Sequence, residues 1–243
     1  NEEYPVYAMT AKDELMFKTP DALLSGQSTV EVIKSCMPAI KDPWNMPSID
    51  LDFALIAIRI ASYGHNMEFE SKCPHCGADS ERSLDLRSVL ERIRVPDYSK
   101  TIQAGDVEVI FRPMSYKNLN DNNLMQFEEQ KILQMLPSAD VPDEQKISAL
   151  SAAMKKITDV TVHALAQSIS SVKTPSAFVT EAEFIEEMLK KCDRLLFNKI
   201  RDHIIKIKAE AEIKPIKITC SECKHEYEQP ITLDMTSFFA DAS

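Results

Sequence analysis

The chain has 243 residues, of which 44% are apolar, and a formal net charge of −10 at neutral pH. This length suffices for one sizeable core or two small ones. The acidic excess argues against a general nucleic-acid-binding role, because neutralising phosphates requires clustered Lys and Arg. With four glycines and no GxGxxG or GxxxxGK[ST] motif, nucleotide-binding loops are not expected, and no apolar run predicts a membrane span. The sequence starts with Asn instead of Met, so we expect processing or residues that lie before it.

The N-terminal segment, as far as Pro38, predicts a short strand followed by two helices. A short strand is expected over residues 4–9, after which Thr10 can cap a helix. Ser28 and Glu31 have the spacing of a capping box, in which each side chain accepts from a free backbone amide. The helix that follows is expected to end at Pro38.

A buried helix is predicted next. Residues 50–63, which we expect Ser48 to cap, are apolar on nearly every side, and Gly64 is a natural helix stop. The helix leads directly into the first of two cysteine pairs. The hairpin at that pair is therefore expected to be anchored in the N-terminal core.

Two cysteine pairs far apart in the chain predict one metal site. Cys73 and Cys76 form the first pair, Cys220 and Cys223 form the second, and more than half of the chain lies between them. Apolar and polar residues alternate in the segments that lead into both pairs, as they do in strands. Four thiolates on two hairpin tips are typical of a Zn(Cys)₄ ribbon, here split by a long insertion. A zinc ion with four thiolate ligands is structural, because no coordination position is left for water.

Other roles for these thiols stay open at this stage. A single CxxC also fits a dithiol redox pair, and unligated thiols are a third alternative. His75 and His225 lie beside the cysteines and are alternative ligands, although exposed positions on the turns are the simpler expectation. Cys36 and Cys192 fall in apolar helical patterns and are expected to be small buried residues. Reduced cysteines at metal-binding spacing favour synthesis in the cytosol.

The segment between the cysteine pairs is predicted to be mostly helical. Residues 101–111 have the pattern of a β-hairpin with a central Gly. Helices are predicted over residues 116–136, 144–172 and 180–210, the last opened by a second capping box.

The apolar stripes of these helices predict a bundle of two or three helices. The alternative is that part of the stripes forms a partner surface with an adaptable methionine lining. The methionines concerned are Met114, Met125, Met135, Met154 and Met188.

No arrangement of residues predicts catalysis. The carboxylates are scattered along helical faces, and runs of charge are most simply solvated surfaces. His65 and His163 have no ExxH or HxxxH companion, and no GxSxG surrounds a serine. We therefore expect a protein that is not an enzyme.

Five segments of the chain carry a resemblance to a known family. They are residues 7–15, 19–26, 45–52, 73–77 and 111–116, namely YAMTAKDEL, TPDALLSG, NMPSIDLD, CPHCG and FRPMSY. Together they resemble the T4-like phage baseplate hub proteins, a family of hub subunits and hub assembly factors. The resemblance implies a non-enzymatic structural or assembly role in the hub of a contractile tail. It also implies other hub or tail proteins as partners, with further copies of the chain itself as a second kind of partner.

Together these observations predict an α+β protein, mainly helical, with a small β layer closed by a split Cys₄ zinc ribbon. We expect three parts: residues 1–66, a split ribbon part of residues 67–115 and 211–243, and a helical insert of residues 116–210. The predicted function is that of a baseplate hub protein whose structural zinc, at Cys73, Cys76, Cys220 and Cys223, holds the fold. The expected location is the host cytoplasm during assembly and the virion tail if the protein is retained. The alternative is a zinc ribbon that binds nucleic acid.

Overall fold

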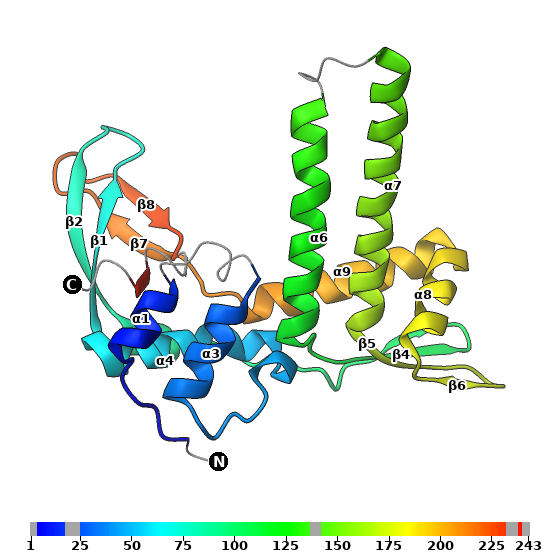
Figure 1. Cartoon of the computed structure of the whole chain (residues 1–243), viewed down its shortest axis with the longest axis horizontal. Helices are drawn as coiled ribbons and strands as arrows, with labels where there is room; N and C mark the ends of the chain where they lie inside the picture. The colour runs from blue at the N-terminus through cyan, green and yellow to red at the C-terminus, as the bar shows by residue number, and fades with distance from the viewer. Residues whose placement is uncertain (1–3, 18–24, 137–141, 232–237, 240–243) are drawn as a thin grey trace. The chain divides into compact units, whose positions relative to one another are not determined.

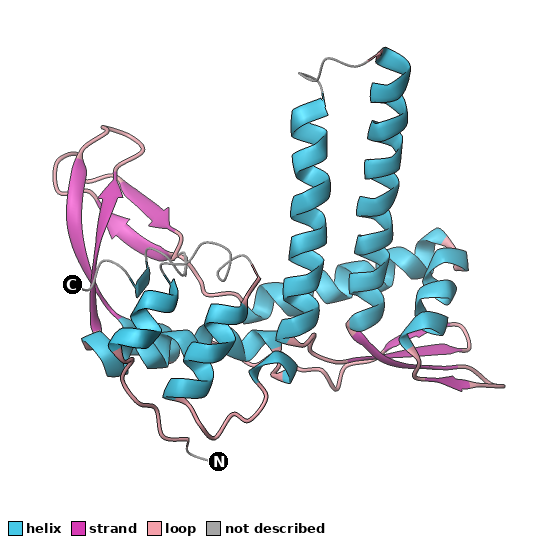
Figure 2. Cartoon of the chain, viewed as in Figure 1, coloured by secondary structure: helices cyan, strands magenta, loops and turns pink. Residues whose placement is uncertain are grey.

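The structure, a computed structural model, describes all residues except 1–3, 18–24, 137–141, 232–237 and 240–243 (Figure 1). It divides into two compact units. The ribbon unit consists of Asn1–Val95 and Ala211–Ser243, and the helical unit consists of Pro96–Glu210. Helices predominate, and all the strands belong to small antiparallel sheets within the described ranges (Figure 2). The predicted α+β, mainly helical fold class is confirmed.

Short helices build the core of the ribbon unit. They are α1 (Ala11–Phe17), α3 (Gln27–Cys36), the 3₁₀ helices η1 (Pro43–Asn45) and η2 (Ser48–Asp50), α4 (Leu51–Tyr63) and α5 (Leu86–Leu90). Ile33 of α3, Ile56 of α4 and Leu86 of α5 are fully buried. Because apolar side chains at helical spacing share one face, each helix can turn a stripe of such residues into this core.

The N-terminal segment corrects the prediction of a strand over residues 4–9. These residues are not part of a sheet, and the amide of Tyr7 donates to the carbonyl of Cys36 at 2.8 Å. A short apolar segment cannot form a strand when no partner strand lies beside it. The helix cap at Thr10 does form, because Thr10 Oγ1 accepts from the Asp13 amide at 3.4 Å, and Asp13 Oδ2 accepts in return from the Thr10 amide at 2.8 Å.

Two other predicted caps are wrong. Helix α3 begins two residues earlier than expected, after Gly26 in a left-handed conformation (φ 72°), so Ser28 lies inside the first turn. The Ser28 hydroxyl donates to the carbonyl of Met16 at 3.0 Å. At α4, Ser48 belongs to η2 and the N-cap residue is Asp50, which makes no side-chain capping bond.

Two hairpins complete the ribbon unit. Strand β1 (Asn66–Lys72) pairs with β2 (Asp79–Asp85), and β7 (Ile216–Thr219) pairs with β8 (Glu226–Gln229), both antiparallel (Figure 1). Alternate residues of β1 and β2 are more buried, so that each strand has one covered face. Both hairpins lie where the alternation predicted them.

The helical unit is built on one antiparallel sheet with the strand order β3-β4-β5-β6. Its strands are β3 (Ile102–Ala104), β4 (Val107–Phe111), β5 (Ile169–Lys173) and β6 (Phe178–Val179). The predicted hairpin over residues 101–111 is confirmed as β3 and β4, which turn at Gly105 with a φ of 59°.

Four helices complete this unit: α6 (Tyr116–Met135), α7 (Asp143–Gln167), α8 (Ala182–Lys191) and α9 (Arg194–Ala211). Figure 1 shows α6 and α7 side by side. The core joins sheet and helices, since Val109 of β4, Ile169 of β5 and Ile200 of α9 belong to one buried cluster.

Two long helices predicted in this region are wrong in part. Helix α7 ends at Gln167 instead of residue 172, because the chain continues as β5, in which Val172 pairs with Val109 of β4. The helix predicted over residues 180–210 is two helices. Asp193 separates them, and its Oδ1 accepts from the amide of Leu196 at 2.9 Å, as an N-cap does. The second capping box does not form, since the N-cap residue of α8 is Glu181, without a capping bond.

Candidate metal centre

The two cysteine pairs lie on turns of the same construction. In the first turn, the Cys73 amide donates to the Ala78 carbonyl at 2.9 Å and the Gly77 amide donates to the Cys73 carbonyl at 2.9 Å. In the second, the Cys220 amide donates to the carbonyl of His225 at 2.9 Å, and the Lys224 amide donates to the Cys220 carbonyl at 3.1 Å. These bonds fold each CxxC segment back on itself, so that both sulfurs of a pair lie on the same side of the turn.

A left-handed residue closes each turn at the corresponding position. Gly77 has a φ of 74°, and Lys224 has a φ of 60°, the only positive φ of a non-glycine residue in the described chain. Glycine adopts this conformation readily, whereas a residue with a Cβ is strained by roughly 1–2 kcal/mol. The second turn therefore keeps its shape at a cost that contacts around it must offset.

The structure brings the four predicted cysteine sulfurs together. Cys73 Sγ lies 3.7 Å from Cys223 Sγ, and Cys76 Sγ lies 3.7 Å from Cys220 Sγ. All four sulfurs lie within 4.8 Å of one another. A tetrahedral zinc ion with Zn–S bonds of about 2.3 Å separates its sulfurs by about 3.8 Å. The donor set thus has the size and chemistry that fit a zinc ion.

Burial differs among the four thiols. Cys73 and Cys220, the first residue of each pair, are buried, whereas Cys76 is exposed and Cys223 is half-buried. The backbone amides of Cys223 and Glu222 point at the Cys220 sulfur and lower its pKa to about 6. For Cys76, the amide of Ala78 acts in the same direction, but contacts with the neighbouring thiols, Cys223 first, and the loss of water beside them raise its pKa to about 12. The cluster by itself does not hold four negative charges, and a bound divalent cation would remove the remaining protons.

The two histidines beside the turns are not part of the sulfur cluster. His75 and His225 are both exposed, and their rings stack with centroids 5.1 Å apart. Among the described residues, the group of side chains that could hold an ion consists of the four cysteines and includes neither histidine. Their contact instead joins the tips of the two hairpins beside the sulfurs.

Polar contacts behind the sulfurs align the hairpins. Ser71 of β1, which is almost fully buried, lies 2.7 Å from Tyr227 of β8, oxygen to oxygen. Arg82 of β2 donates from Nη2 to the carbonyl of Thr219 at 2.9 Å. The sequence did not predict these residues as parts of the site. Their alternation in the strands was the only local signal, because each partner lies on the other side of the long insertion.

The family of the chain follows from a comparison with protein-family models. Residues 3–240 match the family described as T4 bacteriophage base plate protein. The chain belongs to this family. The resemblance to T4-like baseplate proteins is thereby confirmed over nearly the whole sequence, and tail proteins of the phage are the partners that this membership points to. Comparisons with curated proteins and with solved structures found no match.

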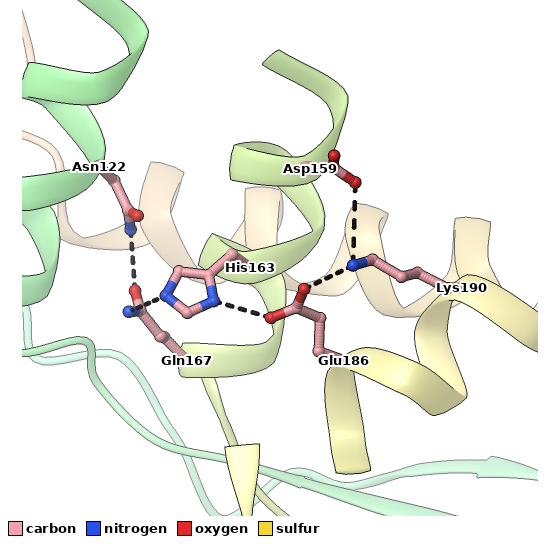
Figure 3. Close-up of polar contacts among 6 residues, drawn as sticks. All are labelled: Asn122, Asp159, His163, Gln167, Glu186 and Lys190. Atoms are coloured by element: carbon pink, nitrogen blue, oxygen red, sulfur yellow. Dashed lines mark hydrogen bonds and ion pairs between the residues drawn. The ribbon is translucent and has the colours of Figure 1, made fainter. Parts of the chain in front are cut away.

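This baseplate protein has a second polar cluster, in its helical unit (Figure 3). His163 of α7 lies between Glu186 of α8, 2.8 Å from its Nδ1, and Gln167, 2.8 Å from its Nε2. Gln167 also accepts from Asn122 of α6 at 2.8 Å. Lys190 donates to Glu186 at 2.7 Å, which together with His163 lowers the pKa of Glu186. The sequence missed Glu186 as a partner of His163, because they lie on different helices and no spacing rule connects them.

The arrangement around His163 connects helices and does not have the form of a catalytic dyad. Both ring nitrogens are engaged, one by the Glu186 carboxylate and one by the Gln167 side-chain amide, so neither is available to activate a nucleophile. The chain of contacts links α6, α7 and α8 across their polar sides. Its geometry is that of a structural hydrogen-bond network.

The five methionines considered from sequence divide between core and surface. Met114 is buried and Met188 packs on the core, but Met125, Met135 and Met154 are each about half exposed or more. The exposed ones lie on α6 and α7 of the baseplate protein, together with exposed Phe127, Ile132 and Ile147. These exposed apolar side chains do not make a membrane span: no helix among the described residues has the length and hydropathy needed to cross a membrane.

Proposed function

We propose that this chain is a non-enzymatic structural or assembly protein of the baseplate hub, in which one zinc ion joins two distant parts of the sequence. The observation that carries the proposal is the cluster of four cysteine sulfurs on two hairpins, whose cysteine pairs are separated by more than half of the chain. Zinc at Cys73, Cys76, Cys220 and Cys223 would be structural, since all four positions are taken by thiolate. We also propose that residues 116–210 act as a helical insert between the two halves of the split ribbon.

Exposed apolar side chains on α6 and α7 support a docking role for the helices. Six large apolar residues on these two helices are exposed, in a hairpin whose remaining surface is largely polar and charged. Exposed apolar side chains that lie together are typical of protein interaction sites. We propose other hub or tail proteins as the partners, with assembly in the host cytoplasm before or during incorporation into the tail.

The zinc part of the proposal is tested by metal analysis of freshly purified protein kept reduced. We expect stoichiometric zinc in the wild type and its loss in Cys73→Ser, whereas Cys192→Ser, which changes a thiol in the helical unit, retains the metal. X-ray absorption at the zinc edge is expected to show sulfur ligands only. Wild-type protein without zinc, or a mixed coordination with water, would contradict a structural Cys₄ site.

The hub part is tested on phage particles. Mass spectrometry of purified tails and of tail assembly intermediates distinguishes a permanent component from an assembly factor. In the first case the protein is present in both, and in the second only in the intermediates. Absence of the protein from both samples would refute a hub role. In a separate assay, salt-sensitive binding of the purified protein to DNA or RNA would favour the alternative of a nucleic-acid-binding ribbon.

A further inference from the structure

The ribbon unit contains an open groove of about 660 Å³ beside its two hairpins. Apolar side chains of both hairpins line it: Phe69 of β1, Leu84 of β2, and Ile216 and Ile218 of β7. All of its lining residues belong to the described part of the chain and to the ribbon unit. The groove is separate from the cysteine cluster, since no cysteine lines it.

The charge of the groove is opposite to that of the whole chain. Arg82, Arg92 and Lys217 line it, and no Asp or Glu does, although acidic residues outnumber basic ones by 38 to 28 in the sequence. Among the described residues, Arg82 donates to uncharged oxygens, those of Ser80 and Thr219. Within the same residues, neither Arg92 nor Lys217 forms an ion pair, although Glu228 of β8 lies opposite Lys217 in the strand register. Three cations and no acidic residue in its lining make this groove a positive site on an acidic protein.

The groove also follows the edges of strands. Consecutive residues of β7, from Ile216 to Thr219, line the groove. Because consecutive side chains of a strand point to opposite faces, a groove that both kinds line runs along the edge of β7. In the described part of the chain, β7 pairs only with β8, and β2 pairs only with β1. The carbonyl of Thr219 already accepts from Arg82, and the rest of such an edge can exchange backbone hydrogen bonds with an extended peptide.

We propose that this groove binds an extended acidic segment of a partner protein, in which Asp or Glu alternates with apolar residues. The carboxylates would meet Arg82, Arg92 and Lys217, and the apolar side chains would face Phe69, Leu84 and the isoleucines of β7. The proposal rests on the hub role proposed above, since the segment would belong to another hub or tail protein, and it names the chemistry of that partner. A peptide fits better than a nucleic acid, because a surface with three cations on a chain of net charge −10 repels a longer polyanion.

Binding of a defined peptide tests the proposal. The probe is a fluorescently labelled peptide in which Asp alternates with Val, and its binding to the full-length, zinc-containing protein is followed by fluorescence anisotropy. The comparison peptide carries Lys in place of Asp. We expect the acidic peptide to bind, more weakly as salt is raised, and the basic peptide not to bind.

A pair of charge-reversed double variants locates the binding site. The first combines Arg92→Glu with Lys217→Glu, two exposed groove residues without side-chain partners in the described chain. The control combines Lys131→Glu with Lys155→Glu, exposed residues of α6 and α7, and so has the same net charge. We expect the groove variant to bind the acidic peptide at least about tenfold more weakly than the wild type, and the control to bind it nearly as well as the wild type.

Three results would overturn the proposal. They are no binding of the acidic peptide, equal losses in the groove variant and the control, or tighter binding of an oligonucleotide of equal charge that the groove variant abolishes. The last result would assign the groove to nucleic acid. Zinc analysis of the same samples separates the groove proposal from the proposed function. If the protein holds zinc and occurs in tails but does not bind the acidic peptide, only the groove proposal is wrong.

Discussion

The ribbon unit and the helical unit differ in what stabilises each of them internally. In the ribbon unit, hairpins from opposite ends of the chain meet at four sulfurs, Ser71, Arg82 and a histidine stack. In the helical unit, an apolar cluster that includes Ile169, Ile185 and Ile200 joins a sheet to its helices without any metal-ligand group among the described residues. Small β hairpins bury little apolar area, so that a metal can supply what their core does not. The comparison therefore predicts different sensitivities for the two units.

Removal of the proposed zinc ion is expected to have the largest effect, and only in the ribbon unit. Cys220→Ser, or a strong chelator, removes a contribution on the order of 10 kcal/mol, comparable to the whole stability of a domain. Trp44 of η1 is the only tryptophan, so its fluorescence reports on the ribbon unit alone. We expect that fluorescence to change while most of the helical circular dichroism persists. Cys192→Ser serves as the control, and a loss of all helical signal on chelation would show that the two units do not differ in this way.

A cavity in the apolar cluster is expected to act on the helical unit, with or without metal. Ile169→Ala removes a fully buried side chain from β5 and should lower the free energy of unfolding by about 2–5 kcal/mol. The control is Ile205→Ala on α9, where the side chain is 56% exposed. Urea unfolding followed by circular dichroism measures both. Equal effects of the two substitutions would contradict the assignment of Ile169 to the core.

A smaller effect is expected at the first helix of the ribbon unit. Asp13 is buried and accepts from Thr10 and Ser35, and although burial alone would raise its pKa, these hydrogen bonds lower it. Asp13→Ala should cost about 1–2 kcal/mol at neutral pH. A lowered pKa means that this stabilisation is full above 3.8, the ordinary value, and is lost as the pH falls below it. Urea unfolding followed by Trp44 fluorescence measures the difference in stability from the wild type, which should shrink in acid. The control is Leu15→Ala on α1, where the side chain is 64% exposed, and this substitution should leave stability nearly unchanged.

The smallest effect is expected at the polar network of the helical unit. Glu186→Gln weakens the contacts to Lys190 and His163, which are partly solvent-exposed, so we expect a loss of up to about 1 kcal/mol. Because these contacts lower the Glu186 pKa, the difference from wild type should be full above 4.5 and diminish as the pH falls through the lowered value. Thermal unfolding by circular dichroism at several pH values measures it. Glu183→Gln, an exposed position on the same helix, is the control, and an effect as large as that of Glu186→Gln would contradict a specific network.

Much of the candidate metal centre could be predicted because its signals are local. The CxxC spacing and the alternation around it specify two tight hairpins, and Gly77 supplies the left-handed residue that the first turn needs. The likeness of the two turns suggested that they form one site, and the structure brings their sulfurs together. In contrast, the groove cations Arg92 and Lys217 have no distinguishing pattern in the sequence, and only the folded hairpins place them on one surface.

The sequence by itself determined the helical spacing of the apolar residues, the two hairpin turns and the four thiols, because these depend on neighbours a few positions away. The tertiary structure decided where helices give way to strands. Residues 169–173 continue the apolar period of α7 but become β5, since their backbone groups pair with β4, which precedes both α6 and α7 in the chain. Likewise, residues 4–9 are apolar and predict a strand, but they have no strand to pair with. In both cases the partner for the backbone hydrogen bonds is distant in sequence, and its presence or absence outweighs local preference.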